Sequence, residues 1–265
     1  MMTLDLSGIG YAPFAPDGDS HRHGDPAVAE ALVSAAGQLS AHRVLGIGAE
    51  ILCHFEALAQ RGFEKLVLDA NETGLARFRH ERRFDAVCAS VLALPFARGS
   101  IDCVIASGIS GGIGDLDAVF REFRRVVRFG AVFEGITRDN FQGLWYRHYF
   151  PQIDSLLRLS YPALGTIVTA ALRGGFSRCT SKAIVRASAR CSAFEAARTR
   201  PELLFDERFR AAIPAFAALD EHAINAGLKA LQCDLDCGRF NQVRESFESL
   251  RVAGGDCFVV TAYAQ

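Results

Sequence analysis

The amino-acid sequence predicts an α/β fold with a doubly wound, mostly parallel sheet. Short apolar segments alternate with amphipathic segments from residue 25 to residue 136 without a break, which is typical of consecutive βαβ units. Residues 101–106 are apolar apart from one aspartate, as expected for a strand covered by helices on both faces. The chain has 265 residues, of which 50% are hydrophobic and 22% are charged, so it can bury the core of one α/β domain.

The first βαβ unit carries the functional signal. An apolar strand over residues 44–47 leads into a glycine-punctuated turn, an amphipathic helix over residues 51–62 and a second apolar strand that ends on Asp69. In nucleotide-binding units, such a turn lets the backbone approach the ligand, and an acidic residue about 20 residues further on binds ribose hydroxyls. The unit therefore predicts a nucleotide-like cofactor at this turn, although Asp69 could instead cap the helix that follows it.

The other elements are predicted from apolar periodicity and turn residues. Asp25 and Pro26 mark the start of the first helix, as its N-cap and first-turn proline, and Gly130 is expected to end a later helix. Further helices are predicted over residues 72–83, 116–127 and 162–173, and residues 192–231 are expected to be mostly helical, with interruptions at Pro201 and Pro214. Further strands are predicted over residues 86–90, 101–106, 131–136, 180–187 and 257–263. Residues 1–24 are predicted to form an irregular N-terminal arm, so the domain covers residues 25–265.

Composition narrows the function classes. The formal net charge of -1 gives no electrostatic footprint for nucleic acid or an anionic membrane. No apolar run approaches the roughly 18 residues of a membrane span, and the first residues lack the pattern of a secretory signal, so a cytoplasmic protein is expected. The eight cysteines are scattered, which predicts small buried side chains in a reducing compartment and no metal site.

Two stretches carry a family resemblance. Residues 90–107 read SVLALPFARGSIDCVIAS, and residues 121–130 read REFRRVVRFG. Both are similar to the class I S-adenosylmethionine-dependent methyltransferases, most closely to the subgroup typified by ubiquinone and menaquinone biosynthesis. The resemblance extends over about residues 25–190. It implies a seven-stranded sheet whose last strand is antiparallel, with S-adenosylmethionine lying over the carboxyl ends of the first four strands.

The same resemblance implies the cofactor-binding residues. They follow the family's glycine motif, the ribose position, the adenine position and the loop after the fourth strand: Gly46, Gly48, Glu50, Asp69, Ala70, Ser90, Val91, Ser107 and Gly108. Three of these depart from the family pattern. Gly46 and Ser90 stand where the family has acidic residues, and Glu50 stands where it has a glycine, which is used there because a Cβ crowds the ligand.

Two functions are therefore open. The first is an S-adenosylmethionine-dependent methyltransferase that acts on a small-molecule acceptor by direct in-line methyl transfer. The second is a methyltransferase-fold protein that no longer transfers methyl groups, either a non-methylating biosynthetic enzyme such as a cyclase or a non-catalytic partner subunit. The sequence does not distinguish a homodimer from a complex with a partner subunit.

The sequence indicates fewer residues for binding the methyl acceptor than for binding the cofactor. Methyl transfer asks mainly for an acceptor held in line and for removal of its proton. His148 is the candidate general base, because the ordinary pKa of histidine lies near neutrality. It lies in the aromatic segment 141–150, which could form a lid over an apolar acceptor or simply pack. Residues 138–165 and 192–250 are expected to cover the substrate.

Overall fold

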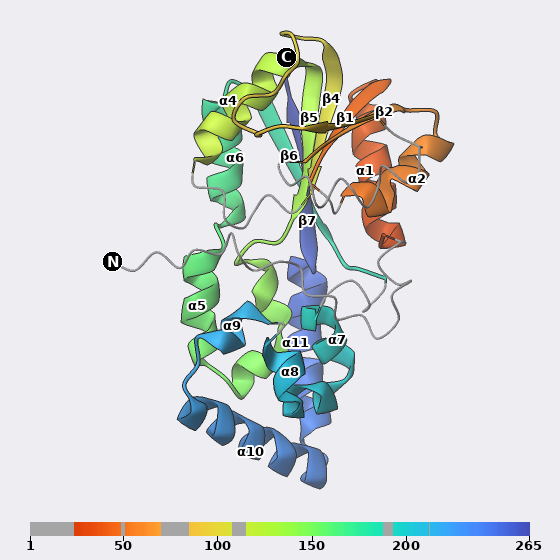
Figure 1. Ribbon diagram of the computed structural model, residues 1–265. Helices are drawn as coiled ribbons and strands as arrows, with labels where there is room; N and C mark the ends of the chain where they lie inside the picture. The colour runs from red at the N-terminus through yellow and green to blue at the C-terminus, as the bar shows by residue number, and fades with distance from the viewer. Residues whose placement is uncertain (1–23, 49–50, 70–84, 108–114, 188–192, 212) are drawn as a thin grey trace.

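A computed structural model of the chain describes residues 24–48, 51–69, 85–107, 115–187, 193–211 and 213–265. Figure 1 shows a sheet with helices on both faces in one half of the molecule and a group of helices in the other half. The predicted α/β class is therefore confirmed. The predicted helix 72–83 and the N-terminal arm lie outside the described residues.

The sheet has seven strands in the order β3-β2-β1-β4-β5-β7-β6. The strands are β1 Arg43–Ile47, β2 Glu64–Asp69, β3 Asp85–Cys88, β4 Ile101–Ser107, β5 Val127–Gly135, β6 Arg178–Ile184 and β7 Cys257–Tyr263. Strands β1 to β5 pair with one another in parallel, and β7 runs antiparallel to β5 and to β6. This confirms the predicted seven-stranded sheet with an antiparallel last strand. The strand order reverses between β1 and β4, where open α/β sheets bind ligands at the carboxyl ends of their strands.

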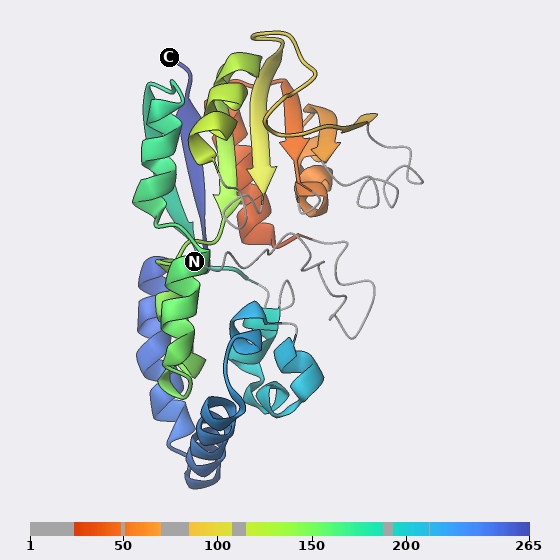
Figure 2. The ribbon, with the colours of Figure 1, turned by 60° about the vertical axis from the view of Figure 1, so that its left-hand side comes forward.

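Two apolar layers hold helices against the sheet (Figure 2). The helices α1 Pro26–Gln38 and α2 Leu52–Gln60 cover one face, and α4 Leu116–Val126 and α6 Leu164–Arg173 cover the other. Strand residues alternate between the two layers as the pleat requires: Val44 packs with α1 and α2, whereas Leu45 and Ile47 pack with α4 and α6. The Asp25 carboxylate accepts hydrogen bonds from the amides of Ala27 and Val28, which confirms the predicted N-cap of α1.

The prediction that Gly130 ends a helix was wrong. The helix α4 ends at Val126 and β5 begins directly at Val127, so Gly130 lies within the strand. A Cβ on Gly130 would lie 2.4 Å from the carbonyl oxygen of Ala262 and 2.7 Å from Leu39 Cδ2. Glycine is required here because the strands and a helix pack closely at this position. In the local sequence, a glycine needed for packing cannot be distinguished from one that ends a helix.

The remaining helices form a separate group beyond the sheet, which we call the cap (residues 136–161 and 193–254). Its elements are η4 Asn140–Gly143, η5 Trp145–His148, α5 Gln152–Ser160, α7 Ala193–Thr199, η6 Pro201–Phe205, α8 Glu207–Ala211, α9 Pro214–Ala217, α10 Glu221–Cys237 and α11 Phe240–Gly254. Trp145, Tyr146 and Phe150 are buried at its centre. The aromatic segment 141–150 therefore supplies the cap's own core, which favours the packing interpretation.

Residues 152–173 are long and apolar enough, by length and composition alone, to cross a membrane, a feature that the sequence reading did not find. In the structure this stretch consists of two helices, α5 and α6, which are separated at Tyr161–Ala163. Ile153 and Leu157 of α5 pack into the cap core, whereas Ile167 and Ala170 of α6 pack against the sheet.

The cysteine prediction holds in part. Cys103 and Cys257 are buried, but Cys88, Cys233 and Cys237 are exposed. Among the described residues, no group of three or more His, Cys, Asp or Glu side chains could hold a metal ion.

The two stretches that resemble the methyltransferase family touch each other through one charged pair. The amide of Leu94 donates to Glu122 Oε1 at 2.6 Å. Arg125 donates to the carbonyl oxygens of Leu94 and Phe96 at 2.8 and 2.7 Å, and it pairs with Glu122 at 2.6 Å. The charged pair on α4 therefore fixes the Leu-Pro-Phe turn that precedes β4.

The hydrogen bonds from Arg125, together with the amide of Leu94, lower the pKa of Glu122 below its usual value of 4.5. A carboxyl group with a depressed folded-state pKa contributes stability above its unfolded pKa and loses it as the pH falls through the folded pKa. We expect Glu122→Gln to lower the free energy of unfolding by about 1–3 kcal/mol near pH 7. The loss should shrink toward zero as the pH falls below 4.5.

Urea unfolding of both proteins from about pH 7 to about pH 3 measures this difference. Glu245→Gln is the matched control, because Glu245 is exposed on α11 and should show little change at any pH. A Glu122→Gln deficit that does not vary with pH would contradict this account of the charged pair.

Candidate functional site

The carboxyl ends of β1, β2 and β4 bring three predicted residues to one edge of the sheet. Gly48 directly follows β1, Asp69 ends β2 and Ser107 ends β4. The amide of Gly48 donates to the carbonyl of Leu68 at 3.2 Å, which links the turn to the end of β2. These positions lie at the reversal of strand order, so the fold gathers them where a ligand is expected.

Gly48 is required by the backbone at this edge. Its φ is +91°, and a Cβ would lie 2.7 Å from the carbonyl oxygen of Ser107. A side chain would therefore be strained in its own conformation and would collide with the end of β4. Gly48 therefore follows β1 in a conformation that favours glycine and lies against the end of β4, while its role in cofactor binding stays a prediction.

Gly46, unlike Gly48, lies within a strand. It is a buried residue in the middle of β1, paired in register with Val67 of β2 and Ile105 of β4. It belongs to the strand that leads to the turn, so its role in cofactor binding stays a prediction.

The other predicted cofactor residues are only partly described. Ser90 is exposed two residues after β3, and its hydroxyl oxygen accepts a hydrogen bond from the amide of Leu92 at 3.2 Å. Val91 is half-buried against the sheet core. Glu50, Ala70, Gly108 and the side chain of Asp69 lie outside the described part of the chain, so their predicted roles remain predictions.

Sequence reading missed two charged residues at the same edge. Glu134, near the end of β5, is only 2% exposed. It accepts a hydrogen bond from Ser107 Oγ at 2.6 Å and one from Arg186 Nη2 at 3.0 Å. An acidic residue inside the apolar run AVFEGI was the signal that could have found it, because a carboxylate is seldom buried without a partner. Arg186 follows β6, and its pairing with β5 has no local signal.

His54 on α2 is a third buried polar group near this edge. The residue is 8% exposed, and its Nδ1 has no hydrogen-bond partner among the described residues. Burial lowers the pKa of His54 below its usual value of 6.5, and the charge of Glu134 opposes that change. The imidazole is therefore mainly neutral at pH 7, with one buried ring nitrogen that a ligand group could satisfy.

His148 lies elsewhere. It is exposed at the end of η5 and lines a cavity of about 540 Å³ in the cap, together with Arg138, Arg147, Asp154, Phe247 and other residues. The described lining contains none of the predicted cofactor residues. The role of His148 as a general base therefore stays a prediction.

We expect Gly48→Ala to lower the free energy of unfolding by about 1–3 kcal/mol, because it combines an unfavourable φ with a collision against β4. Gly37→Ala is the matched control: Gly37 lies in α1, and a Cβ there meets nothing within 4 Å. That substitution should be neutral or stabilising, since alanine favours a helix over glycine. Thermal and urea unfolding measure both variants, and equal effects of the two would contradict the assigned role of Gly48.

Residues 45–133 match a family model described as a methyltransferase domain. No curated protein matches the sequence. Three solved structures share the fold over most of their length, each at 20% identity or less.

A protein from Anabaena variabilis ATCC 29413, described as a methyltransferase from an antibiotic biosynthesis pathway, has a TM-score of 0.68 at 20% identity, over 92% of this chain and 99% of that chain. A protein from Galdieria sulphuraria, described as a sarcosine dimethylglycine methyltransferase, has a TM-score of 0.52 at 14% identity, over 90% and 85%. A SAM-dependent methyltransferase from Archaeoglobus fulgidus has a TM-score of 0.50 at 14% identity, over 89% and 94%. Residues 45–133 therefore match a methyltransferase domain, and the chain as a whole shares the fold of these methyltransferases.

Proposed function

We propose that this protein transfers a methyl group from S-adenosylmethionine to a small-molecule acceptor by direct in-line transfer. The observation that carries the proposal is the turn at Gly48, whose backbone lies against the end of β4 with no room for a Cβ. Such a turn presents main-chain groups at the switch point of the sheet, where a nucleotide-like cofactor can approach closely. When bound, S-adenosylmethionine supplies a methyl group on an electrophilic sulfonium.

The residues at this edge fit that cofactor. Asp69 ends β2 beside the turn and is our candidate for the ribose hydroxyls. Ser90, after β3, is the candidate on the adenine side, where its hydroxyl proton can donate one hydrogen bond. The main chain at Gly48 and Ser107 would border the methionine end.

The acceptor would enter between this edge and the cap. Glu134, Arg186 and His54 supply polar groups on the sheet side, and we propose that residues 138–165 and 192–250 cover the substrate from the cap side. The neutral imidazole of His54 can take a proton at physiological pH. A small-molecule acceptor agrees with the substrates named for the Galdieria relative and with the absence of a strong net charge. We place the protein in the cytoplasm.

A protein that has lost methyl transfer is the second candidate. Gly46 lies inside β1 where the family has an acidic residue, and the Ser90 oxygen is engaged in a local turn. Both features reduce the number of charged groups that can hold the cofactor.

Calorimetric titration with S-adenosylmethionine and S-adenosylhomocysteine separates these functions. We expect one site per chain with micromolar affinity. Asp69→Ala should weaken binding about tenfold or more, because hydrogen bonds to a charged group are lost. Asp85→Ala, at the exposed start of β3, is the matched control and should bind normally. Absence of binding to the wild type at millimolar ligand would rule out the methyltransferase proposal.

Glu50→Gly tests the altered glycine motif. Glu50 brings a negative charge and a Cβ to the position where the family has glycine, and the charge repels the cofactor's own carboxylate. We expect Glu50→Gly to raise the affinity for S-adenosylhomocysteine in the same titration, and Glu50→Gln to raise it less, since only the charge is removed. Weaker binding of Glu50→Gly would mean that this carboxylate contributes a ligand contact of its own.

A further inference from the structure

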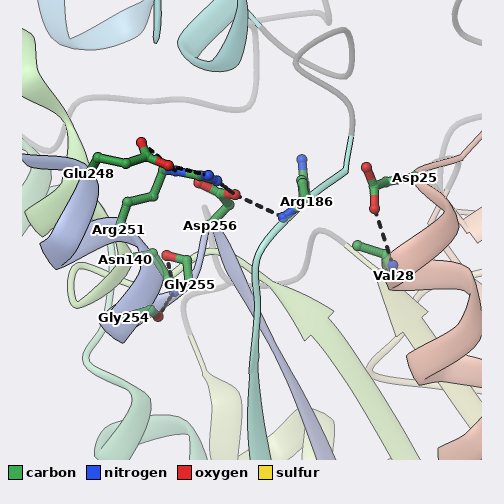
Figure 3. A network of polar contacts seen from close by, with 9 residues as sticks. All are labelled: Asp25, Val28, Asn140, Arg186, Glu248, Arg251, Gly254, Gly255 and Asp256. Carbon is green, nitrogen blue, oxygen red and sulfur yellow. Dashed lines mark hydrogen bonds and ion pairs between the residues drawn. The ribbon is translucent and has the colours of Figure 1, made fainter. Parts of the chain in front are cut away.

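A line of buried polar contacts connects the cap to the carboxyl edge of the sheet. Figure 3 shows its outer part, where Arg251 of α11 and Arg186 both reach Asp256. Arg251 Nη1 and the backbone amide of Arg186 donate to the same oxygen, Asp256 Oδ2, at 2.5 and 2.8 Å. Asp256 immediately precedes β7 and Arg186 follows β6, so α11 is bound to the edge formed by these two strands.

The line continues inward to the cofactor turn. Arg186 Nη2 donates to Glu134 Oε1 at 3.0 Å, and Glu134 Oε2 accepts from Ser107 Oγ at 2.6 Å. The carbonyl of Ser107 is the group that leaves no space for a Cβ on Gly48. Contacts therefore run without a gap from the cap helix across β7, β6, β5 and β4 to the turn after β1.

The charges in this line alternate and are removed from solvent. The side chains of Arg251, Asp256 and Arg186 are 10%, 10% and 12% exposed, and that of Glu134 is 2% exposed. Buried charges are weakly screened, and each depends on its neighbours because an unpaired charge is costly at such sites. Loss of one member would therefore disturb the positions of the others.

A second set of contacts fixes the same end of α11. Asn140 Nδ2 donates to the carbonyl oxygens of Gly254 and Gly255 at 3.0 and 3.3 Å, as Figure 3 also shows. Its Oδ1 accepts from the amide and hydroxyl of Thr137 at 2.8 and 3.0 Å. The segment that follows β5 therefore fixes the connection between α11 and β7. As a result, α11 can hardly shift without moving the edge of the sheet.

We propose that Arg251 and Asp256 are positioning residues for cofactor binding, which act through Arg186 and Glu134 on Ser107 and the adjoining turn. This inference rests on the cofactor site given under the proposed function. It makes the cap helix a determinant of cofactor affinity although none of the proposed cofactor residues lies in α11. By thermodynamic linkage, cofactor binding must then stabilise the end of α11 by the same factor.

The test uses the full chain and S-adenosylhomocysteine as the probe. Asp256→Asn and Arg251→Met each interrupt the line, and calorimetry is expected to give about tenfold weaker binding for both, within the usual range of coupling between sites. The double variant should lose no more than either single one, because the line is already broken. Arg251→Lys, which keeps the charge, should recover part of the affinity. Asp154→Asn breaks the Arg147–Asp154 ion pair elsewhere in the cap and should bind like the wild type.

Hydrogen exchange supplies a readout that does not depend on affinity. In the wild type, saturating S-adenosylhomocysteine is expected to slow amide exchange at residues 251–256, and in Asp256→Asn this slowing should disappear. Folded Asp256→Asn and Arg251→Met proteins with wild-type affinity would overturn the inference, and so would an equal loss in Asp154→Asn, which would indicate general weakening of the cap.

If Asp256→Asn does not fold, the wild-type exchange measurement decides alone, and unchanged exchange at residues 251–256 overturns the coupling. A wild type that does not bind S-adenosylhomocysteine overturns the proposed function together with this inference. Normal wild-type binding without coupling overturns only the inference.

Discussion

The close approach of the turn after β1 to the end of β4 depends on the missing side chain at Gly48. With a Cβ at this position, the Ser107 carbonyl and the turn could not both keep their places. The strand order reverses between these two strands, which is where open α/β sheets bind ligands. Ser107 in turn holds Glu134 and, through it, Arg186. One backbone contact thus organises both the turn after β1 and the polar groups beside it.

Local patterns predicted the elements whose residues carry their own signal. The bounds of β7 and the N-cap at Asp25 follow directly from apolar runs and capping chemistry. The boundary between α4 and β5 could not be predicted, because Gly130 is required by its close contacts with Leu39 and Ala262, which lie far away in the sequence. A glycine needed for packing and a glycine needed for a turn look the same in a single sequence.

The residues of the candidate site likewise divide into those that the sequence predicts and those that only the tertiary structure reveals. Gly48 and Asp69 were predictable because the βαβ unit fixes their positions in the chain, and Ser107 was predicted from the resemblance of residues 90–107 to a methyltransferase motif. Glu134 left a weak signal as a charge within an apolar strand, but its partner Arg186 is set only by the pairing of β6 with β7 and of β7 with β5. His54 gave no signal, since a histidine on an amphipathic helix does not reveal whether its face is buried. Sequence reading thus finds residues tied to a motif and misses those that tertiary register brings together.

The position of β7 has a consequence for how the molecule acquires its structure. Strand β6 meets the sheet only through β7, and the cap segment from α7 to α11 lies between these two strands in the chain. Until the segment between β6 and β7 folds and β7 pairs with β5, β5 presents an open edge with unpaired main-chain groups. Such an edge can pair with strands of other molecules. Completing the sheet and assembling the cap are therefore coupled events with high contact order, and the partly folded chain is exposed to aggregation for as long as they take.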